Sequence, residues 1–339
     1  MYLITGGSGF LGTGLARRLT ACGGLPVRIF DLRGGRDLPA GAEFFRGDIR
    51  EPEDVGKAVE GASTVFHLAS LLPCARAGKG FYEVNVEGTR NLMEACRRQG
   101  VKRVVYVSSS SVYGLPVALP LREDSSVNPV GDYGRSKLLG EEVCRGYMDS
   151  GMVGVSVIRP RFIIGPGRLG LLEIIFGWVR ENRNVYTIGR GDNRFQMVGV
   201  EDLIDACLLA AASGKNGVYN IGADGVPAVK ELLAGLIRHA RSSSALVPLN
   251  APAVKLGMRI LDALNLVAFS REQYLLADKE YILDTSKAKE ELGWRPKYTH
   301  AGAFNAAYDW YINNQSVSGE ENKSDHPPEK ILRLLKYLP

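Results

Sequence analysis

The sequence has few of the features that mark disulfide-bonded, metal-binding or membrane-spanning proteins. It contains five cysteines in 339 residues, an odd number without a Cys-x-x-Cys pair, which supports neither a disulfide framework nor a zinc site. We therefore expect free thiols in a reducing compartment and no bound metal. The most apolar late stretch, residues 252–270, contains three charged side chains and is a poor candidate for a membrane span.

A large excess of charge of one sign is also absent. Lys and Arg number 42 and Asp and Glu 37, which gives a net charge of +5. This mild excess favours anionic small molecules, but it is too small and too scattered to indicate nucleic-acid binding. Hydrophobic residues at 45% and charged residues at 23% are typical of a globular chain and exclude disordered, collagenous and coiled-coil proteins. The apolar start at residues 1–4 is typical of a strand and not of a signal peptide, so we expect a cytoplasmic protein.

Glycine is the residue in excess, with 40 copies against 16 prolines. Since proline occurs at its usual frequency, the extra glycine does not come from low-complexity linkers. We infer that the glycines occupy positions where the backbone needs them.

Short apolar runs alternate with amphipathic segments from the first residue to Pro160. The runs that predict strands are Tyr2–Thr5, Val27–Phe30, Glu43–Arg46, Thr64–Leu68, Val104–Ser108 and Val155–Arg159. The segments that predict helices are Leu11–Cys22, Glu53–Glu60, Tyr82–Gln99 and Tyr133–Met148. Alternating strands and helices predict an α/β fold with a doubly wound parallel sheet. The later helices of a smaller, mixed C-terminal lobe are predicted near Leu171–Arg180, Val229–Arg241 and Ala253–Leu264.

The segment Thr5–Gly12 follows the first predicted strand and opens the first predicted helix. A helix N-terminus presents backbone N–H groups, and glycines let a diphosphate reach them. We expect Gly6 to allow a tight turn, Gly9 a close approach, and Gly12 the packing of helix on strand. Asp31 ends the second strand, where a carboxylate accepts hydrogen bonds from a ribose diol and repels a 2′-phosphate. The segment therefore predicts a dinucleotide site that prefers NAD to NADP, with an ordinary turn and a loop-capping aspartate as the simpler alternative.

A second set of residues predicts acid/base chemistry. Ser108–Ser111 ends the fifth strand, at the carboxyl edge where ligands bind in such sheets. Tyr133 and Lys137 are four residues apart and share one face of a helix. A neighbouring ammonium favours the phenolate, so Tyr133 can exchange a proton with an alcohol or a ketone while a hydride moves. Such Tyr–Lys pairs are common in helices, and this one gains weight from the glycine loop and the serines.

Together these motifs resemble the extended short-chain dehydrogenases/reductases of the NAD-dependent epimerase/dehydratase family. The matching stretches are Thr5–Gly12, Gly47-Asp48, His67–Ala69, Asn85–Thr89, Ser108–Gly114, Tyr133–Lys137, Arg159-Pro160, Gly165–Gly167 and Asp284–Trp294 with Pro296. The resemblance implies a Rossmann-type NAD-binding domain at 1–165 with parts of 190–225. A substrate-binding lobe would follow at 166–189 and 226–312, with a polar linker and an amphipathic tail at 313–339.

The resemblance implies a role for each matching residue. Tyr133 would be the acid/base, Lys137 would hold the nicotinamide ribose, and Ser109 would orient the substrate oxygen. Asp48 would contact the adenine and Asn85 would give polar support, unless they are an N-cap and a buried amide. The expected cofactor-binding residues are Gly6, Gly9, Phe10, Leu11, Gly12, Asp31, Arg33, Asp48, Ile49, Leu68, Ala69, Ser70, Asn85, Ser108, Tyr133, Lys137 and Pro160.

The resemblance argues against dehydration. Sugar 4,6-dehydratases of this family carry an Asp-Glu pair directly after the catalytic hydroxyl residue, whereas this chain has Ser110 and Ser111. Hydroxyl groups cannot do that carboxylate work at neutral pH. An epimerase or a plain dehydrogenase is therefore implied.

The substrate lobe leaves three functions open. Nucleotide-sugar relatives usually have a phosphate-binding arginine where this chain has Phe195, and Arg194 lies one residue early. Apolar residues 253–269 are more similar to 3β-hydroxysteroid and dihydroflavonol dehydrogenases. We expect a nucleotide-sugar epimerase or dehydrogenase first, a hydrophobic-alcohol dehydrogenase or reductase second, and a non-catalytic NAD-binding regulatory module third. The candidate substrate residues are Ser110, Ser111, Arg161, Arg168 and Arg194, and for each arginine a solvated surface position is the favoured alternative.

The resemblance also implies a homodimer, because relatives often pack two long helices from each subunit into a four-helix bundle. Here these helices would be Tyr82–Gln99 and Tyr133–Met148. The amphipathic tail at residues 330–339 would clasp a partner subunit, rest on a membrane surface or fold back on its own lobe.

Overall fold

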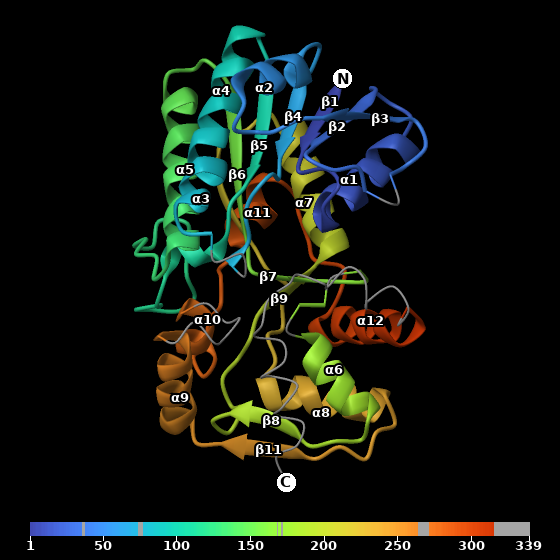
Figure 1. Cartoon of the computed structure of the whole chain (residues 1–339), viewed down its shortest axis with the longest axis vertical. Coiled ribbons are helices and arrows are strands. Elements are labelled where there is room, and N and C mark those ends of the chain that lie inside the picture. Colours follow the sequence, from blue (N-terminus) through green and yellow to red (C-terminus); the bar gives the residue numbers. More distant parts are fainter. Residues whose placement is uncertain (36–37, 74–76, 168, 171, 264–270, 315–339) are drawn as a thin grey trace. The chain divides into compact units, whose positions relative to one another are not determined.

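The computed structural model describes residues 1–35, 38–73, 77–167, 169–170, 172–263 and 271–314 (Figure 1). These residues form two compact units. The first comprises Met1–Arg161, Val200–Gly222 and Leu283–Arg295. The second comprises the described residues of 162–199, 223–282 and 296–314.

The first unit is built on a seven-stranded parallel sheet with the order β10-β6-β5-β4-β1-β2-β3. The strands are β1 (Tyr2–Thr5), β2 (Val27–Asp31), β3 (Ala42–Arg46), β4 (Thr64–His67), β5 (Arg103–Val107), β6 (Gly154–Pro160) and β10 (Gly217–Ile221). The order steps outward from β1 in both directions, which confirms the predicted α/β fold class. Because Thr5 pairs with Phe30 and with His67, the chain leaves these three strands side by side at the carboxyl edge.

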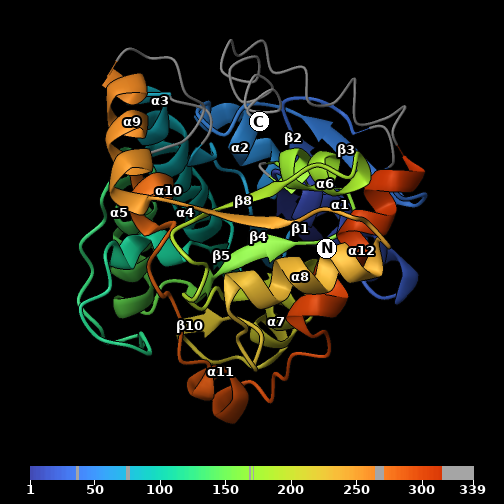
Figure 2. The ribbon, with the colours of Figure 1, turned by 90° about the horizontal axis from the view of Figure 1, so that it is seen from below.

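Helices cover both faces of this sheet (Figures 1 and 2). Three helices pack side by side on one face: α2 (Pro52–Val59), α4 (Gly88–Arg98) and α5 (Asp132–Asp149). Two helices pack together on the other: α1 (Phe10–Ala21) and α7 (Val200–Ala212). The strands and helices predicted as far as Pro160 all occur, apart from the irregular start of one helix.

That helix was predicted as Tyr82–Gln99. In the structure, α3 (Lys79–Tyr82) leads into a π-helical turn at Glu83–Glu87, and α4 begins only at Gly88. A π turn widens the helix and is often found at functional sites. Here it buries Asn85, whose side chain and backbone carbonyl both make hydrogen bonds in the site described below.

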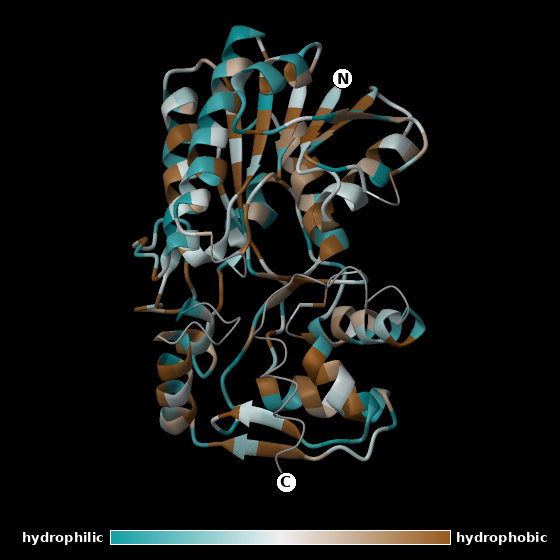
Figure 3. Cartoon of the chain, viewed as in Figure 1, coloured by the Kyte–Doolittle hydropathy of each residue, from teal (hydrophilic) through white to brown (hydrophobic). Residues whose placement is uncertain are grey.

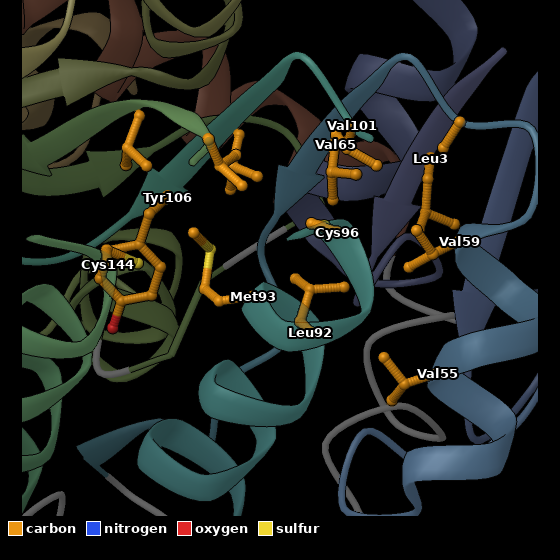
Figure 4. Packing of buried hydrophobic residues seen from close by; sticks show 14 of the residues in the cluster. Leu3, Val55, Val59, Val65, Leu92, Met93, Cys96, Val101, Tyr106 and Cys144 are labelled. Carbon is orange, nitrogen blue, oxygen red and sulfur yellow. The ribbon is translucent and has the colours of Figure 1, made fainter. Parts of the chain in front are cut away.

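One hydrophobic core of the first unit lies between the sheet and the face formed by α2, α4 and α5. Hydrophobic residues follow the strands of the sheet (Figure 3). Val55 and Val59 are four residues apart on α2 and point the same way, toward the sheet. Figure 4 shows them packed with Leu3, Val65, Leu92, Met93, Cys96, Val101, Tyr106 and Cys144. This packing fixes α4 and α5 against the strands, and α5 carries Tyr133 and Lys137.

The second unit has two small parallel sheets and several helices. The strands pair as β7 (Phe162–Ile164) with β9 (Met197–Gly199), and as β8 (Val185–Ile188) with β11 (Leu246–Leu249). Its helices are α6 (Leu172–Arg180), α8 (Val229–His239), α9 (Ala251–Ala263), α10 (Arg271–Leu276) and α12 (His300–Asn313). The Phe176 ring packs edge-on against Phe304 and Tyr308, with centroids 5.3 and 5.4 Å away. Among the described residues, every helix is too short or too polar to span a bilayer.

The division into units differs from the predicted domain boundaries. Residues 162–165 lie in the second unit, and residues 283–295 lie in the first. This last segment includes α11 (Ser286–Glu291), and its Trp294 is fully buried. The Trp294 indole N–H donates to the carbonyl of Asp202 on α7 at 2.8 Å, which anchors the segment to the first unit. The predicted linker and tail lie outside the described residues from position 315 onward.

Candidate functional site

The glycine loop lies at the carboxyl end of β1. Gly6 has a φ of +67°, a left-handed conformation that favours glycine, and its N–H donates to the Phe30 carbonyl at 2.9 Å. A Cβ built on Gly6 would lie 2.7 Å from the backbone of Ala69. A Cβ built on Gly12 would lie 2.5 Å from the Cα of Gly7. Backbone therefore approaches backbone on both sides of the loop, which agrees with the expected tight turn and helix packing.

The first turn of α1 is the part of the loop that suits an anion. Gly9 is the N-cap and is extended, and among the described residues no side chain caps this helix. The first turn also has no acidic residue. Phe10, Leu11 and Gly12 are the residues whose N–H groups lie in this turn, where the helix itself offers no acceptor. A diphosphate can bind at such a helix start.

Asp31 ends β2 beside this loop. Its Oδ2 accepts a hydrogen bond from the Ser8 N–H at 3.1 Å, which ties the carboxylate to the loop. The Ser8 hydroxyl is buried and has no hydrogen-bond partner among the described residues, so the loop contains a polar atom that a ligand could satisfy. The carboxylate, the helix start and this hydroxyl together fit a dinucleotide.

Three other expected cofactor residues differ in how well they are placed. Arg33 is exposed. The Asp48 carboxylate accepts from Nη2 of Arg50 at 2.5 Å, and this hydrogen bond holds the pKa of Asp48 below its usual value. The Ile49 side chain is buried where a Cβ on Gly88 would lie 2.8 Å from its Cγ2. The Ile49 side chain is therefore packed against the start of α4.

A chain of hydrogen bonds holds the segment that follows β4. The Ala69 N–H donates to Oγ1 of Thr5 at 3.3 Å, and this hydroxyl lies 2.7 Å from Nδ1 of His67. Nε2 of His67 lies 2.9 Å from Oγ1 of Thr89, whose proton goes to the Asn85 carbonyl at 2.7 Å. Because the Thr89 proton is already used, His67 donates from Nε2 and accepts at Nδ1. The imidazole is therefore a neutral, fixed tautomer.

Asn85 secures the other end of this segment. Its Oδ1 accepts the Leu71 N–H at 2.8 Å, and its Nδ2 donates to the Ser136 hydroxyl on α5 at 2.9 Å. Leu68–Ser70, whose three residues were expected to bind the cofactor, is thus held between β1 and α5.

Tyr133 and Lys137 lie in the first turns of α5. Lys137 is 3% exposed, its Nζ donates to the Val107 carbonyl at 2.6 Å, and it lies 4.7 Å from the centre of the Tyr106 ring. Burial lowers the pKa of Lys137 to about 8. Burial and the nearby ammonium lower the pKa of His67 to about 3. The Val107 bond uses one of three ammonium N–H groups, which leaves donors for a ligand hydroxyl.

Gly134 brings the start of α5 against the serine segment, Ser108–Ser111. A Cβ built on Gly134 would lie 2.6 Å from the carbonyl oxygen of Ser111. Ser109 accepts the Ser111 N–H on its Oγ at 3.2 Å, which orients its hydroxyl. Tyr133 directly precedes Gly134. The structure therefore brings the serine segment to the part of α5 that carries the expected acid/base residues.

A buried ion pair beside these residues was not expected from the sequence. Glu141 on α5 and Arg159 on β6 are 1% and 2% exposed and share hydrogen bonds of 2.9 and 2.6 Å. The Ser108 hydroxyl donates to Glu141 at 2.5 Å, and Pro160 follows Arg159 at the end of its strand. The available signals were an acidic residue four positions after Lys137 and an arginine closing an apolar run. Neither signal identifies its partner.

The arginine expected to bind a phosphate has other contacts within the second unit. Arg194 forms hydrogen bonds of 2.9 and 3.1 Å with the Glu280 carboxylate. Phe195, which occupies the position of the relatives' arginine, packs against Phe162 with ring centroids 5.5 Å apart. The second unit therefore places an aromatic pair where a phosphate-binding arginine was sought.

The remaining candidate substrate residues are Ser110, Ser111, Arg161 and Arg168. Ser110 is buried and Ser111 is partly buried. The backbone N–H of Arg161 donates to the Ile221 carbonyl at 2.8 Å. Arg168 lies outside the described residues. Among the residues that the structure describes, no cluster of His, Cys, Asp or Glu side chains could hold a metal ion. The four described cysteines are free thiols: Cys22, Cys96, Cys144 and Cys207.

Comparison with known sequences connects this site to one family. The sequence pattern of the NAD dependent epimerase/dehydratase family matches residues 2–222. An uncharacterised protein of Sinorhizobium fredii is 34% identical over 99% of this chain and 85% of its own length. A UDP-glucose 4-epimerase of Mycolicibacterium smegmatis is 30% identical over 92% of this chain and 98% of its own length. The human decarboxylating sterol-4-alpha-carboxylate 3-dehydrogenase is 34% identical over 61% of this chain, which matches only 56% of that longer protein.

Solved structures with the same fold include two epimerases. The UDP-glucose 4-epimerase of Thermotoga maritima, solved with UDP-glucose, has a TM-score of 0.78 and 25% identity, over 93% of this chain and 99% of that one. The UDP-glucose 4-epimerase of Thermus thermophilus, solved with NAD, has a TM-score of 0.75 and 25% identity, over 92% of this chain and 99% of that one.

Proposed function

Since this chain belongs to the NAD dependent epimerase/dehydratase family, we propose that it is an NAD-dependent oxidoreductase that transfers a hydride at a secondary alcohol or ketone. In this proposal it epimerises or oxidises a nucleotide sugar. The observation that carries the proposal is the packing of the serine segment against the turn of α5 that holds Tyr133 and Lys137. Ser110 and Ser111 stand where a 4,6-dehydratase would carry carboxylates, so the proposal excludes dehydration.

NAD accepts and returns the hydride when it is bound, and the first unit has groups that suit each part of it. The N–H groups at the start of α1 would hold the diphosphate. The Asp31 carboxylate would accept hydrogen bonds from the adenosine ribose and repel a 2′-phosphate, which favours NAD over NADP. Lys137 would donate to the nicotinamide ribose through the N–H groups that Val107 does not use. The NAD bound to the similar Thermus epimerase supports this cofactor.

Tyr133 is the proton acceptor and donor of the proposed reaction. During oxidation its phenolate takes the proton of the substrate hydroxyl as the hydride leaves the adjoining carbon, and during reduction the phenol returns a proton to the ketone oxygen. The buried Lys137 ammonium stabilises the phenolate, because charges interact strongly in a low dielectric. The Ser109 oxygen already accepts the Ser111 N–H, so its own proton is available for the substrate oxygen.

Replacing Tyr133 by Phe tests the acid/base assignment. Tyr133→Phe keeps the ring and removes the hydroxyl, so turnover should fall about 10²- to 10⁴-fold while NAD still raises the melting temperature. Tyr147→Phe is the matched control, because Tyr147 lies near the other end of the same helix and its hydroxyl donates to Glu94 at 3.3 Å. The control should turn over like the wild type. Unchanged turnover in Tyr133→Phe would refute the assignment.

The structure and the comparisons support two different substrate classes. Similarity over nearly the whole chain to UDP-glucose 4-epimerases favours a nucleotide sugar. The Phe195–Phe162 pair and the engagement of Arg194 with Glu280 favour the second candidate, a dehydrogenase or reductase of a hydrophobic alcohol. The partial match to the human sterol dehydrogenase supports the same candidate.

Redox balance separates these candidates. The purified protein is incubated with NAD and panels of nucleotide sugars and hydroxysteroids, and NADH and products are quantified. An epimerase yields the epimer without net NADH, whereas a dehydrogenase yields one NADH per product. Stabilisation by UDP or dTDP in a melting assay supports the nucleotide sugar, and no response to any nucleoside diphosphate would refute it. NAD binding without turnover on either panel would favour the regulatory module.

The homodimer and the cytoplasmic location stay predictions. α4 and α5 pack side by side, as the expected four-helix bundle requires of each subunit. Light scattering at micromolar concentration should give twice the 36.9 kDa chain mass, and a monomeric mass would count against the dimer. Fluorescence microscopy of the tagged protein checks the location.

A further inference from the structure

The serine segment is anchored at both ends by a buried polar network in the first unit. At its start, the Ser108 hydroxyl donates to Oε1 of Glu141 at 2.5 Å. Just beyond its end, the Tyr113 hydroxyl accepts from Nη1 of Arg159 at 2.9 Å and donates to Oδ1 of Asn220 at 2.7 Å. The ion pair of Glu141 and Arg159 lies between these two anchors. The network therefore links β5, β6, β10 and α5 around the serines.

The ion pair uses most of its hydrogen-bonding capacity within this network. Oε1 of Glu141 accepts from Ser108 and from Nε of Arg159, and Oε2 accepts from Nη2. Nη1 of Arg159 donates to Tyr113 and to the Glu123 carbonyl at 3.2 Å. Both charged side chains are at most 2% exposed. A shift of α5 along the sheet would leave a buried charge without its partner. The network therefore permits only one position of α5 relative to the strands.

A contribution to stability alone does not explain why this position holds an ion pair. Hydrophobic residues of similar volume often replace a buried ion pair with no loss of stability. An apolar pair would fill the space, but it could not direct the Ser108 hydroxyl or fix the serine segment relative to α5. Glu141 lies two turns beyond Tyr133 on that helix, with Lys137 between them. The network thus holds Ser108 and Tyr113, which flank Ser109 in the chain, and the helix that carries Tyr133 and Lys137.

We propose that Glu141 and Arg159 are positioning residues for hydride transfer, whose buried pair holds the Ser109 hydroxyl in register with Tyr133 and Lys137. This inference rests on the proposed function, because it adds residues to the same site. Electrostatics act in the same direction. Burial has the largest effect on the pKa of Lys137 and lowers it, while Glu141 raises it and so favours the charged ammonium.

The decisive variant removes both charges together. Glu141→Met combined with Arg159→Met leaves no charge unpaired, so folding and NAD binding should persist. The kcat should fall about 10- to 100-fold, because the serine loses its register with the acid/base tyrosine. The KM for NAD should change less than kcat, because the glycine loop and Asp31 are untouched and only the support of Lys137 is altered. A purely structural role would instead lower the melting temperature and leave kcat unchanged.

Two single-hydroxyl variants keep the test usable if the double variant does not fold. Ser108→Ala and Tyr113→Phe each remove one anchor of the serine segment and leave the ion pair in place. Each should lower kcat about 3- to 10-fold, and Tyr113→Phe, which lies outside the expected cofactor-binding residues, should do so at unchanged KM for NAD. Glu43→Gln is the control, because it breaks an exposed ion pair with Arg28 in the same unit and should leave kcat unchanged.

The inference is overturned if the folded double variant keeps the wild-type kcat. It is also overturned if that variant does not fold and both single-hydroxyl variants turn over normally. Tyr133→Phe is measured beside them to separate this inference from the proposed function. Turnover that survives Tyr133→Phe refutes the proposed function, whereas turnover lost in Tyr133→Phe but kept in the double variant refutes only the positioning role.

Discussion

Adding one methyl group at Gly134 should raise the activation free energy of the reaction by more than it lowers the free energy of unfolding. Gly134 is buried near the start of α5, and its added Cβ would lie 2.6 Å from the Ser111 carbonyl oxygen. A second close contact, 2.9 Å, would form with Cβ of Pro129. Ordinary contact begins at 3.4 Å, so the start of α5 must move away from the serine segment by about 0.8 Å.

The expected magnitudes follow from this displacement. Overpacking of a buried site costs about 1–3 kcal/mol, and the better helix propensity of Ala offsets up to about 1 kcal/mol. The net loss of stability should therefore be about 0–2 kcal/mol. A misplacement of about 1 Å can reduce a rate about 10²-fold, so kcat should fall about 30- to 100-fold.

Steady-state kinetics and thermal unfolding measure the two effects on the same preparations. Gly146→Ala is the matched control on α5, because a Cβ there meets nothing within 4 Å. This control should gain up to about 1 kcal/mol of stability and keep the wild-type kcat. If Gly134→Ala also kept the wild-type kcat, the distance between the serine segment and α5 would not govern the reaction. The acid/base assignment would then lose its geometric basis.

Three further perturbations address the cofactor, the buried lysine and the neutral histidine. Asp31→Asn keeps the size of the side chain and removes its charge, so the Kd for NAD should rise about 10-fold and the discrimination against NADP should shrink. Calorimetric titration with both dinucleotides checks this, and an unchanged preference would contradict the role of Asp31. Burial lowers the pKa of Lys137 from 10.5 to about 8, so between these values the unfolded chain binds more protons than the folded one. As the pH rises through that window, the free energy of unfolding of the wild type should therefore increase by on the order of 3 kcal/mol relative to that of Lys137→Met. Urea unfolding of both proteins at pH 7 and pH 10 measures the difference, and a constant difference would contradict a buried ammonium. Thr89→Val should be about 1–3 kcal/mol less stable than Thr89→Ser, because it leaves the buried Nε2–H of His67 without an acceptor. Equal unfolding midpoints for the two Thr89 variants would contradict the assigned tautomer.

The parts of the first unit that could be predicted from the sequence depend on local signals. The glycine loop combines a strand end, a turn and a helix start within one short segment, so consecutive residues determine its geometry. The spacing of Tyr133 and Lys137 is likewise a property of a single helix. Consecutive βαβ units then place both motifs at one edge of the sheet, because parallel strands end together.

The parts that could not be predicted depend on partners far apart in sequence. Glu141 and Arg159 belong to different elements, and only the packing of α5 on the sheet brings them together. The π-helical turn at Glu83–Glu87 differs from an α-helix by one residue of register, which hydrophobic periodicity does not resolve. Residues 283–295 come directly after a segment of the second unit, residues 223–282, but they belong to the first unit, where Trp294 is buried.

The first unit consists of three separate segments of the chain. It therefore cannot finish folding when only its N-terminal segment has emerged from the ribosome. A nascent chain that ends near Arg161 has β6 as an open edge, since its neighbour β10 begins only at Gly217. Unpaired edges of this kind invite association with other chains. Even after β10 has joined, the Asp202 carbonyl lacks its indole donor until Trp294 emerges. Most of the second unit is therefore synthesised before the first unit can finish folding. A fragment that ends at the end of β6 should be less stable than the whole chain.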